Sequence, residues 1–319
     1  MGYLETQWQR GRKIYGKRSW RETRRTFLHT MRSIRNKREI EALENYFASY
    51  TPDPTLLDRQ VGLFELMTRY FLFKSSTPQE RLEAIINHFD YLKDVFTDEA
   101  IREMYSVDPD NIYDDVSRMN RGFIVWESED LDMVARLYYG PGQRKECFLT
   151  LLLTLGKQGV YHANFRFGKG FNGEPAMWIG TIQGYKDGLD NAKTVTKKMF
   201  GYRPKNFIMF LLRHIAALCN VESIYAVSDE GFYANTHLVR GHRAKVAELD
   251  PLWEESGGVV CSDDRFFNIP LEEYRKPIEE IKSQKRSQYR KRYELLDQYE
   301  QEIQDHLKPL LRVKSISIK

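Results

Sequence analysis

Residues 201–229 read GYRPKNFIMFLLRHIAALCNVESIYAVSD, and the order of turn, helix and strand in this stretch decides the fold. Phe207 to Cys219 is an apolar run that only two polar residues interrupt. A membrane span needs ~20 apolar residues, so this run is expected to form a buried helix. Pro204 has no N–H and suits the first turn of that helix. Ser223 to Val227 is rich in β-branched and aromatic residues, which predicts a strand.

Upstream and downstream of this stretch, short apolar segments alternate with turn residues. Five segments predict an antiparallel meander: Phe123 to Glu127, Met133 to Tyr139, Phe148 to Leu155, Val160 to Phe167 and Ala176 to Ile182. Gly168 to Gly173 is interpreted as a hairpin loop. Further on, we expect a helix over residues 245–255 that stops at Gly257-Gly258, and a last strand over residues 266–270.

Helical patterns dominate both ends of the chain. The first ~120 residues are predicted to be mainly helical, because their apolar positions recur with a helical period. Thr77 to Glu80 fits a capping box, and Leu56 to Phe73 is expected to be one helix. Pro277 to about His306 is predicted to be a charged helix. The sequence therefore predicts an α+β protein with a helical N-terminal region, a mostly antiparallel sheet flanked by helices, and a C-terminal charged helix.

We divide the chain into four parts on these patterns. They are a basic amphipathic helical segment (residues 1–50), a helical region (51–121), an α/β sheet domain (122–275), and a charged helix with a tail (276–319). Thr51-Pro52-Asp53-Pro54 breaks the helical pattern and marks the first boundary.

The composition excludes several classes of protein. Apolar residues make up 41% and aromatic residues 13% of the 319 residues, which is enough for a sizeable core and too much for a disordered chain. Three widely spaced cysteines exclude a disulfide scaffold and predict buried thiols in a reducing compartment. We therefore expect a cytoplasmic protein, with peripheral attachment to the inner membrane as an alternative.

The net charge of +4 conceals an uneven distribution. Residues 1–38 carry 12 Lys/Arg against 2 acids, residues 39–271 carry 25 against 34, and residues 272–319 carry 12 against 9. A basic segment that also holds Trp8 and Trp20 is able to lie on an anionic membrane surface. It is equally able to dock on the acidic body of its own chain. A nucleic-acid partner is not expected, because no nucleic-acid-binding signature is present.

Seven short motifs, taken in order and spacing, resemble those of the VirK/YbjX family, a bacterial domain of unknown function. They are IGTIQG (179–184), TKK (196–198), GYRPKN (201–206), IYAVSD (224–229), WEESGG (253–258), FNIP (267–270) and KRSQYRKRY (285–293). The resemblance implies a protein of Gram-negative bacteria that supports envelope integrity, virulence or resistance to antimicrobial peptides. The chain departs from the family pattern after Asp229 and before Trp253, so we assign no role to the family residues expected there.

The order of elements is also similar, more distantly, to the Gcn5-related acyltransferase fold, in which residues 122–275 would form the sheet domain. In that fold the N-terminus of a helix binds the pyrophosphate of an acyl-CoA, because free N–H groups and the positive end of the helix dipole suit phosphate. Here ~20 residues separate the preceding strand from the helix, whereas the acyltransferase loop follows its strand directly.

This second resemblance implies acyl-CoA as a cofactor. It implies cofactor-binding roles for Arg203, Lys205, Asn206, Lys197 and Lys198. The alternative is that Arg203 and Lys205 are ordinary surface residues and that Pro204 merely separates two helices.

Catalytic candidates are few. Asp229 follows a predicted strand and is a candidate general base or substrate anchor, and Gln183 ends the neighbouring strand on the same expected rim. The alternative for Asp229 is a turn or helix cap, which Asp favours. No HExxH motif and no His/Cys cluster is present, so no metal is expected.

Two functions remain open. The first is an acyl-CoA-dependent transferase that acts on the bacterial envelope, on a small molecule or on a peptide. It requires that the backbone amides leading into Phe207 be unpaired and face a cavity able to hold a diphosphate. The second is a non-catalytic peripheral membrane or adaptor protein with a degenerate acyltransferase fold, attached through residues 1–38.

Overall fold

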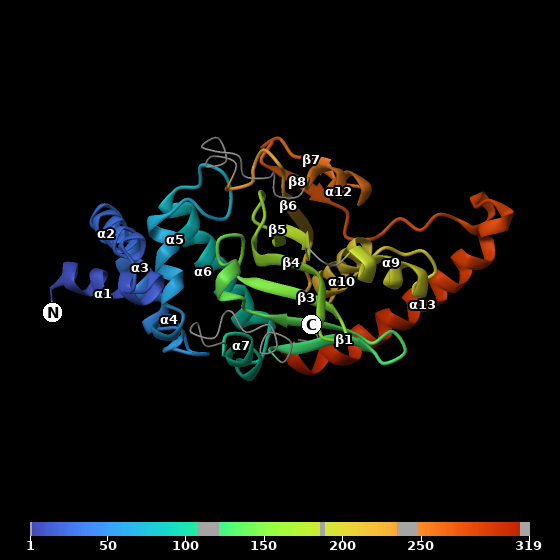
Figure 1. Cartoon of the computed structure of the whole chain (residues 1–319), viewed down its shortest axis with the longest axis horizontal. Helices are drawn as coiled ribbons and strands as arrows, with labels where there is room; N and C mark the ends of the chain where they lie inside the picture. Colours follow the sequence, from blue (N-terminus) through green and yellow to red (C-terminus); the bar gives the residue numbers. More distant parts are fainter. Residues whose placement is uncertain (1, 107–120, 186–188, 235–247, 313–319) are drawn as a thin grey trace, which may run out of the picture.

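The computed structural model describes residues 2–106, 121–185, 189–234 and 248–312, and an eight-stranded sheet forms its centre (Figure 1). The strands are β1 (Phe123–Ser128), β2 (Met133–Tyr138), β3 (Leu149–Leu155), β4 (Gln158–Lys169), β5 (Pro175–Gly184), β6 (Ser223–Val227), β7 (Val259–Val260) and β8 (Phe266–Ile269). They lie side by side in the order β1-β2-β3-β4-β5-β6-β8-β7. The predicted α+β class with a mostly antiparallel sheet is confirmed.

β5 and β6 run parallel, whereas the other neighbouring strands of the described sheet are antiparallel. Parallel neighbours need a crossover connection, which α9 (Leu189–Lys198) and α10 (Pro204–Leu218) supply. The pairing between β5 and β6 ends at Ile179 and Ala226, although β5 continues to Gly184. The two strands therefore stop pairing before the carboxyl end of β5.

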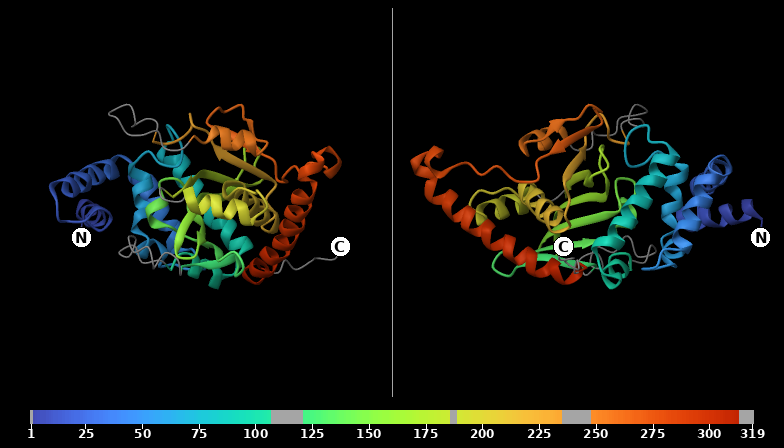
Figure 2. Two further views of the ribbon diagram at one scale, coloured as in Figure 1. Left: turned by 45° about the vertical axis from the view of Figure 1, so that its right-hand side comes forward. Right: turned by 180° about the vertical axis from the view of Figure 1, so that it is seen from behind.

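The helices gather around the sheet and at the two ends of the molecule. The remaining ones are α1 (Tyr3–Tyr15), α2 (Trp20–Arg35), α3 (Lys37–Ala48), α4 (Leu56–Arg59), α5 (Phe64–Thr68), α6 (Pro78–Val95), α7 (Asp98–Met104), α12 (Asp250–Glu255) and α13 (Ser283–Leu307). Short 3-10 turns cover residues 61–63, 141–143, 278–280 and 308–310. α1 and α2 lie at one end and the start of α13 at the other (Figures 1 and 2). Within the described ranges, no helix is both long enough and apolar enough to cross a membrane.

Most predicted elements are present, with three differences. The helix expected over residues 56–73 is broken into α4, a 3-10 turn and α5. Residues 63–68 are buried on every side, which one amphipathic helix does not allow, and the Gln60 side chain bonds the Tyr105 carbonyl at the bend. The described part of the helix expected at 245–255 begins at Asp250, and residues 245–247 lie outside the described ranges. β7 was not predicted, because two residues carry no periodic signal.

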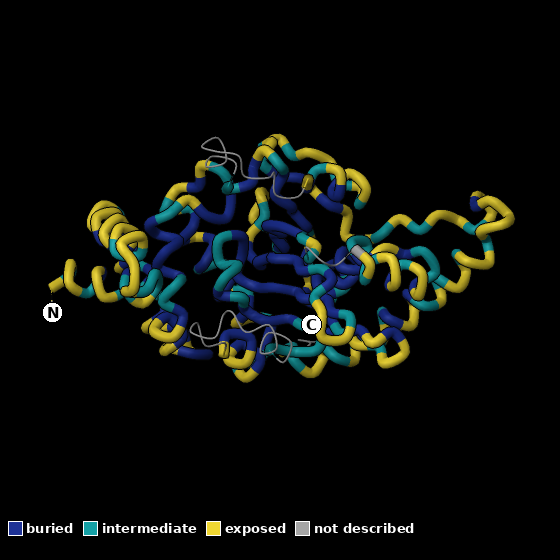
Figure 3. Tube along the Cα trace, in the orientation of Figure 1, coloured by how far each residue is buried: buried dark blue, intermediate teal, exposed yellow. Residues whose placement is uncertain are grey.

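One buried cluster joins the helices to the sheet (Figure 3). Trp126 of β1 packs edge-to-face against Phe207 of α10 at 4.7 Å and against Tyr299 of α13 at 4.6 Å. The Trp126 indole N–H donates to Glu302 at 2.9 Å. The buried residues of α13 all lie from Leu296 onward, so the sheet anchors only the second half of that helix.

A buried ion pair ties the N-terminal helices to the loop between β2 and β3. Glu65 of α5 is 1% exposed and pairs with Arg144 and with Arg69, the latter at 3.2 Å. The Tyr15 hydroxyl also donates to Glu65 at 2.9 Å. Burial alone would raise the pKa of Glu65, but Arg144 and Arg69 hold it below its ordinary value.

We expect Glu65→Gln to lower the free energy of unfolding by about 3 kcal/mol at pH 7, because removing one member of a buried pair leaves its partner uncompensated. The pKa of Glu65 is lower in the folded state, so this stabilisation is present above the unfolded value near 4.3 and is lost as the pH falls through the folded value. Urea unfolding at pH 7 and pH 4 measures both effects. Glu99→Gln, in an exposed pair with Arg102, is the control. A loss below 1 kcal/mol for Glu65→Gln contradicts this account.

Candidate functional site

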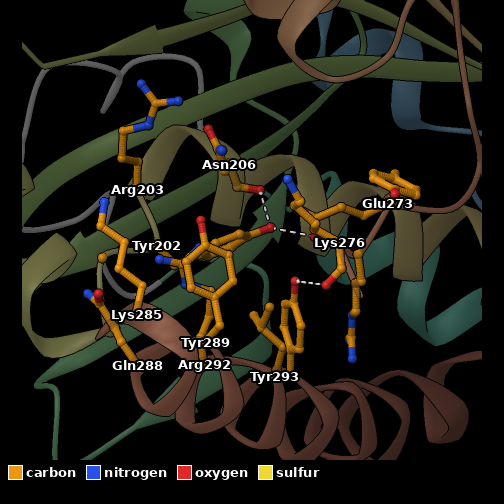
Figure 4. A pocket seen from close by; sticks show the side chains of 14 residues that line it. Tyr202, Arg203, Asn206, Glu273, Lys276, Lys285, Gln288, Tyr289, Arg292 and Tyr293 are labelled. Atoms are coloured by element: carbon orange, nitrogen blue, oxygen red, sulfur yellow. Dashed lines mark hydrogen bonds between the residues drawn. The ribbon is translucent and has the colours of Figure 1, made fainter. Parts of the chain in front are cut away.

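A pocket of about 490 Å³ opens between the start of α10, the loop after β8 and the first half of α13 (Figure 4). Its charged lining residues are five cations, Arg203, Arg275, Lys276, Lys285 and Arg292, and one acid, Glu273. Such an excess of positive charge in a concave surface attracts anions.

Tyrosine rings form much of the remaining wall. The lining includes Tyr202, Tyr274, Tyr289 and Tyr293. The Arg292 guanidinium lies 4.2 Å from the centre of the Tyr289 ring, a cation–π contact that fixes the planar group. The Tyr293 hydroxyl donates to the Lys276 carbonyl at 3.0 Å, which ties the loop to α13 (Figure 4). The wall therefore combines positive charge with flat apolar surface.

Tyr202 and Glu273 close the deep side of the pocket. The Tyr202 hydroxyl donates to Glu273 at 2.7 Å (Figure 4). Burial and the neighbouring Glu273 carboxylate raise the pKa of Tyr202 well above its ordinary value. A hydrogen bond from a neutral phenol does not cancel the charge of a carboxylate, so Glu273 offsets one of the five cations of the lining.

Gly201 lets α13 approach the start of α10. Its φ is +79°, a left-handed conformation that glycine adopts without strain. A Cβ at this position would lie 2.8 Å from Gln288 Nε2 and 3.0 Å from Arg292 Nη2. Arg292 in turn donates to the Phe200 carbonyl from Nε and Nη2, at 3.2 and 2.8 Å. A side chain in place of this glycine would push the two walls apart.

The cations of the pocket differ in how they are neutralised. Arg203 pairs with Glu255, and Arg275 pairs with Asp297. Among the described residues, Lys276 and Lys285 have no carboxylate within ion-pair distance of their ammonium groups, and Arg292 contacts only a carbonyl and aromatic rings. Lys276, Lys285 and Arg292 therefore leave the pocket with uncompensated positive charge.

Three of the five sequence-predicted cofactor ligands meet at one carboxylate. Glu255 of α12 pairs with Arg203, accepts from Lys205 at 2.6 Å and accepts from Asn206 at 3.3 Å. Arg203 and Asn206 line the pocket, and Lys205 lies beside them. A carboxylate of the chain itself thus occupies the position at the start of α10 where a phosphate was expected.

The other two predicted ligands are elsewhere. Lys198 donates to the Leu131 carbonyl at 3.3 Å, and Lys197 is exposed on α9. Neither residue lines the pocket.

The expectation that the amides leading into Phe207 are unpaired is wrong for four of them. The amides of Gly201 and Tyr202 donate to the carbonyls of Thr196 and Met199, at 2.7 and 2.9 Å. The amides of Asn206 and Phe207 donate to the Arg203 carbonyl, at 2.9 and 3.0 Å. These four amides are not available to an anion, so the cationic side chains of the lining are the main donors that the pocket offers.

The two predicted catalytic residues make separate contacts. Asp229 accepts from the Leu249 amide at 3.0 Å, and its own amide donates to Asp250 at 2.7 Å. Asp229 thereby links the end of β6 to the start of α12, as a cap does. The Gln183 side chain donates to Thr181 at 3.2 Å, within β5.

A buried carboxyl that the sequence did not indicate lies where β5 and β6 stop pairing. Glu146 is 8% exposed and accepts from Asn164 at 2.5 Å, and a Cβ on Gly180 of β5 would lie 2.3 Å from the Glu146 carbonyl oxygen. Burial raises the pKa of Glu146 to about 7. Burial thus favours the protonated form of this carboxyl.

Sequence reasoning missed most of the pocket lining. Residues 285–293 were noted as basic with two tyrosines, but that pattern is most often a solvated helix face. Only the contact of α13 with Phe200 and Gly201 turns it into a pocket wall.

Comparison with known proteins places the chain among relatives without an assigned function. The family model described as "Protein of unknown function (DUF535)" matches residues 18–305. The chain is 28% identical over 257 residues to the uncharacterized protein YbjX of Escherichia coli K12, covering 76% of this chain and 71% of that protein. It is 23% identical over 313 residues to an uncharacterized protein of Haemophilus influenzae Rd, covering 94% and 96%. No solved structure matches the chain.

We expect Glu255→Gln to raise the affinity for inorganic pyrophosphate about fivefold, because loss of one carboxylate worth ~1 kcal/mol frees Arg203 and Lys205 for the ligand. Isothermal titration at low salt measures the change. Glu254→Gln is the matched control on α12, since Glu254 is exposed and does not line the pocket. Equal affinity of both variants and the parent protein would show that phosphate does not reach Arg203 and Lys205.

Proposed function

This chain belongs to the DUF535 family, the VirK/YbjX proteins of unknown function, and we propose that it is an acyl-CoA-dependent acyltransferase that acts at the bacterial envelope. The observation that carries the proposal is the cationic, tyrosine-lined pocket beside the start of α10. A role in envelope integrity, virulence or resistance to antimicrobial peptides is the biological setting that we propose for this activity.

The lining of the pocket suits the chemistry of coenzyme A. Coenzyme A carries a diphosphate, a further phosphate and an adenine ring. Lys276, Lys285 and Arg292 supply charge-assisted hydrogen bonds to phosphate, and the tyrosine rings offer surfaces on which a base stacks. In this proposal side chains of α13 replace the free amides that the acyltransferase analogy called for.

The strand order also supports the proposal. A parallel strand pair, joined by a crossover that ends in α10 and followed by an antiparallel pair, is the arrangement that we compare with the Gcn5-related fold. β5 and β6 stop pairing after Ile179 and Ala226, and the proposal places the thioester arm beside these strand ends. The insertion of α9 before α10 is a difference from that fold.

The proposed reaction transfers an acyl group from the thioester sulfur to an amine. The new C–N bond forms as the C–S bond breaks, the amine proton passes to a base, and the thiolate leaves and is protonated. A base works best when its pKa lies near the operating pH, which Glu146 satisfies, while Asp229 and Gln183 remain candidates for placing the substrate.

We expect coenzyme A and acetyl-CoA to bind to the intact protein in isothermal titration, and Lys285→Glu to weaken that binding at least tenfold, since it reverses one uncompensated charge. Arg290→Glu makes the same charge change on α13 outside the pocket lining and is expected to leave binding unchanged. No heat from the folded parent protein would remove the cofactor claim.

A second candidate function, peripheral membrane attachment, rests on a different observation. α2 turns its small polar side chains inward and its large apolar ones outward. The inward ones are Thr26, His29, Thr30 and Ser33, each at most 8% exposed. The outward ones are Trp20 (81% exposed), Phe27 (54%), Met31 (47%) and Ile34 (45%). Their spacing of seven, four and three residues puts them on one face of the helix.

The packing of α1 against α2 explains why the side chains of α2 that face α1 are small. A Cβ on Gly11 of α1 would lie 2.9 Å from the Thr26 methyl group, so the two helices touch closely. The hairpin is held to the body by an ion pair between Arg10 and Glu44 and by the hydrogen bond from Tyr15 to Glu65. The basic segment therefore docks on the body through α1 and through the inner face of α2, where His29 lies 3.0 Å from the Thr68 hydroxyl, and it leaves the apolar face of α2 in solvent.

The charge on this face favours an anionic bilayer. Arg24 lies four residues after Trp20, and Arg35 lies four residues after Met31. Each basic side chain near an anionic surface contributes ~1 kcal/mol. Each large apolar side chain contributes ~1.5–3 kcal/mol when fully buried. These terms together suffice for reversible attachment of the protein.

We expect the full chain to sediment with phosphatidylglycerol vesicles and not with phosphatidylcholine vesicles. The exchange of Trp20→Ala together with Phe27→Ala should reduce the bound fraction severalfold, because both rings are exposed and their loss does not disturb the core. Val259→Ala, at a residue that is 69% exposed on β7, is the control. Equal sedimentation of the double variant and the parent would contradict docking through α2, and no sedimentation of the parent would favour a protein partner instead.

A further inference from the structure

Arg166 of β4 is a buried cation that has no polar partner among the residues that the structure describes. Its residue is 8% exposed, and within the described ranges no hydrogen bond or ion pair engages its guanidinium. The guanidinium lies over the Trp178 ring, whose centre is 4.8 Å from the guanidinium carbon. Burial lowers the pKa of Arg166 to about 10, so the group is still charged at neutral pH.

The other buried arginines of the described chain are satisfied by the protein. Arg213 donates to the carbonyls of Pro270 and Ser256, at 3.0 and 2.7 Å. Arg81 donates to the carbonyls of Leu66 and Ser76. An uncompensated buried charge is costly, so proteins pair such groups or leave them open to a ligand. Arg166 differs from its counterparts in this respect.

Arg166 opens into a pocket of about 180 Å³ at the start of α6 and the hairpin between β4 and β5. The aromatic lining residues are Phe73, Phe171, Trp178 and Phe266. Phe171, from the hairpin loop, is half exposed and stands 5.2 Å from Trp178 and 5.8 Å from Phe266. The pocket thus has aromatic surface beside one buried fork of N–H donors, and charged residues complete its lining.

The acids around this pocket are already engaged. Asp263 pairs with Arg265 at 2.7 Å. Glu80 accepts from the Thr77 amide in the capping box at 2.7 Å, and Glu83 accepts from Gln79 at 2.8 Å. Lys169 adds a second positive charge at the rim. The lining holds three cations against three acids, so its formal charge is zero, and the need for an anion arises at Arg166 itself, to which none of these three acids is ion-paired.

We propose that this pocket binds a small carboxylic acid with an apolar body, whose carboxylate takes the guanidinium fork of Arg166 and whose body lies against Trp178 and Phe171. Arg and carboxylate match in planar, bidentate geometry. A cavity near 150 Å³ accommodates benzene, so the pocket suits a molecule of about the size of benzoate or phenylacetate. The site is separate from the pocket beside α10 and shares none of its lining residues.

Titration of the full chain with sodium phenylacetate tests the proposal, with phenylacetamide as the uncharged isostere. We expect the acid to bind at least tenfold more tightly than the amide, and Arg166→Met to abolish that preference. The dipeptide Gly-Phe distinguishes two sources of the same carboxylate: binding as tight as that of phenylacetate assigns the site to peptide C-termini, and weaker binding assigns it to free acids. Equal binding of acid and amide overturns the proposal.

Arg213→Met is the matched control. It also removes a buried arginine, but one whose N–H groups already donate to backbone carbonyls. We expect it to lower the melting temperature and to keep the preference for the acid. Arg166→Met is expected to leave the melting temperature unchanged or higher, since it removes an uncompensated charge. A fall as large as that of Arg213→Met would show that Arg166 already has a partner within the fold, and would overturn the proposal. Arg166→Lys, which keeps the charge and loses the fork, should retain only part of the preference.

Discussion

The burial of α10 between the sheet and α13 is the constraint on which the rest of the structure depends. Phe207 at the start of this helix contacts both Trp126 of β1 and Tyr299 of α13. The same helix completes the crossover that makes β5 and β6 parallel. Because the cluster holds only the second half of α13, the first half is left to form a wall with the start of α10. The pocket thus follows from the way in which the sheet and α13 cover the apolar helix α10.

The charged groups of this molecule differ in whether the protein itself supplies their hydrogen-bond or ion-pair partners. Glu65, Arg81 and Arg213 are buried and fully partnered, as buried charges generally are. Among the described residues, Arg166 lacks such a partner, and Lys276 and Lys285 of the α13 pocket have no carboxylate within ion-pair distance. The contrast lies within one molecule, so a general looseness of packing does not explain it. It points to two places, the pocket at Arg166 and the pocket between α10 and α13, where an external anion would pair with a positive charge.

The two ends of the molecule expose different kinds of surface, one apolar and one charged. At one end α2 exposes large apolar side chains flanked by arginines, although its buried face consists of small polar groups. At the other end α13 exposes charged and tyrosine side chains around a concavity (Figure 4). A protein held on a membrane by α2 would keep the α13 pocket facing away from the lipid. Attachment and ligand binding would then not compete.

The sequence by itself determined the α+β class, the meander, the core helix and the capped start of α6, because alternation, helical period and capping act over a few neighbouring residues. It also placed Arg203 and Asn206 at a pocket, through a motif that opens a helix. It did not indicate that Glu255 takes the expected phosphate position, nor that the amides before Phe207 close on their own carbonyls. The contact of Arg292 with Phe200 joins residues 92 positions apart, and no local pattern encodes such a meeting. Only the tertiary structure decided which cations are neutralised, because pairing depends on distances that packing sets and periodicity does not.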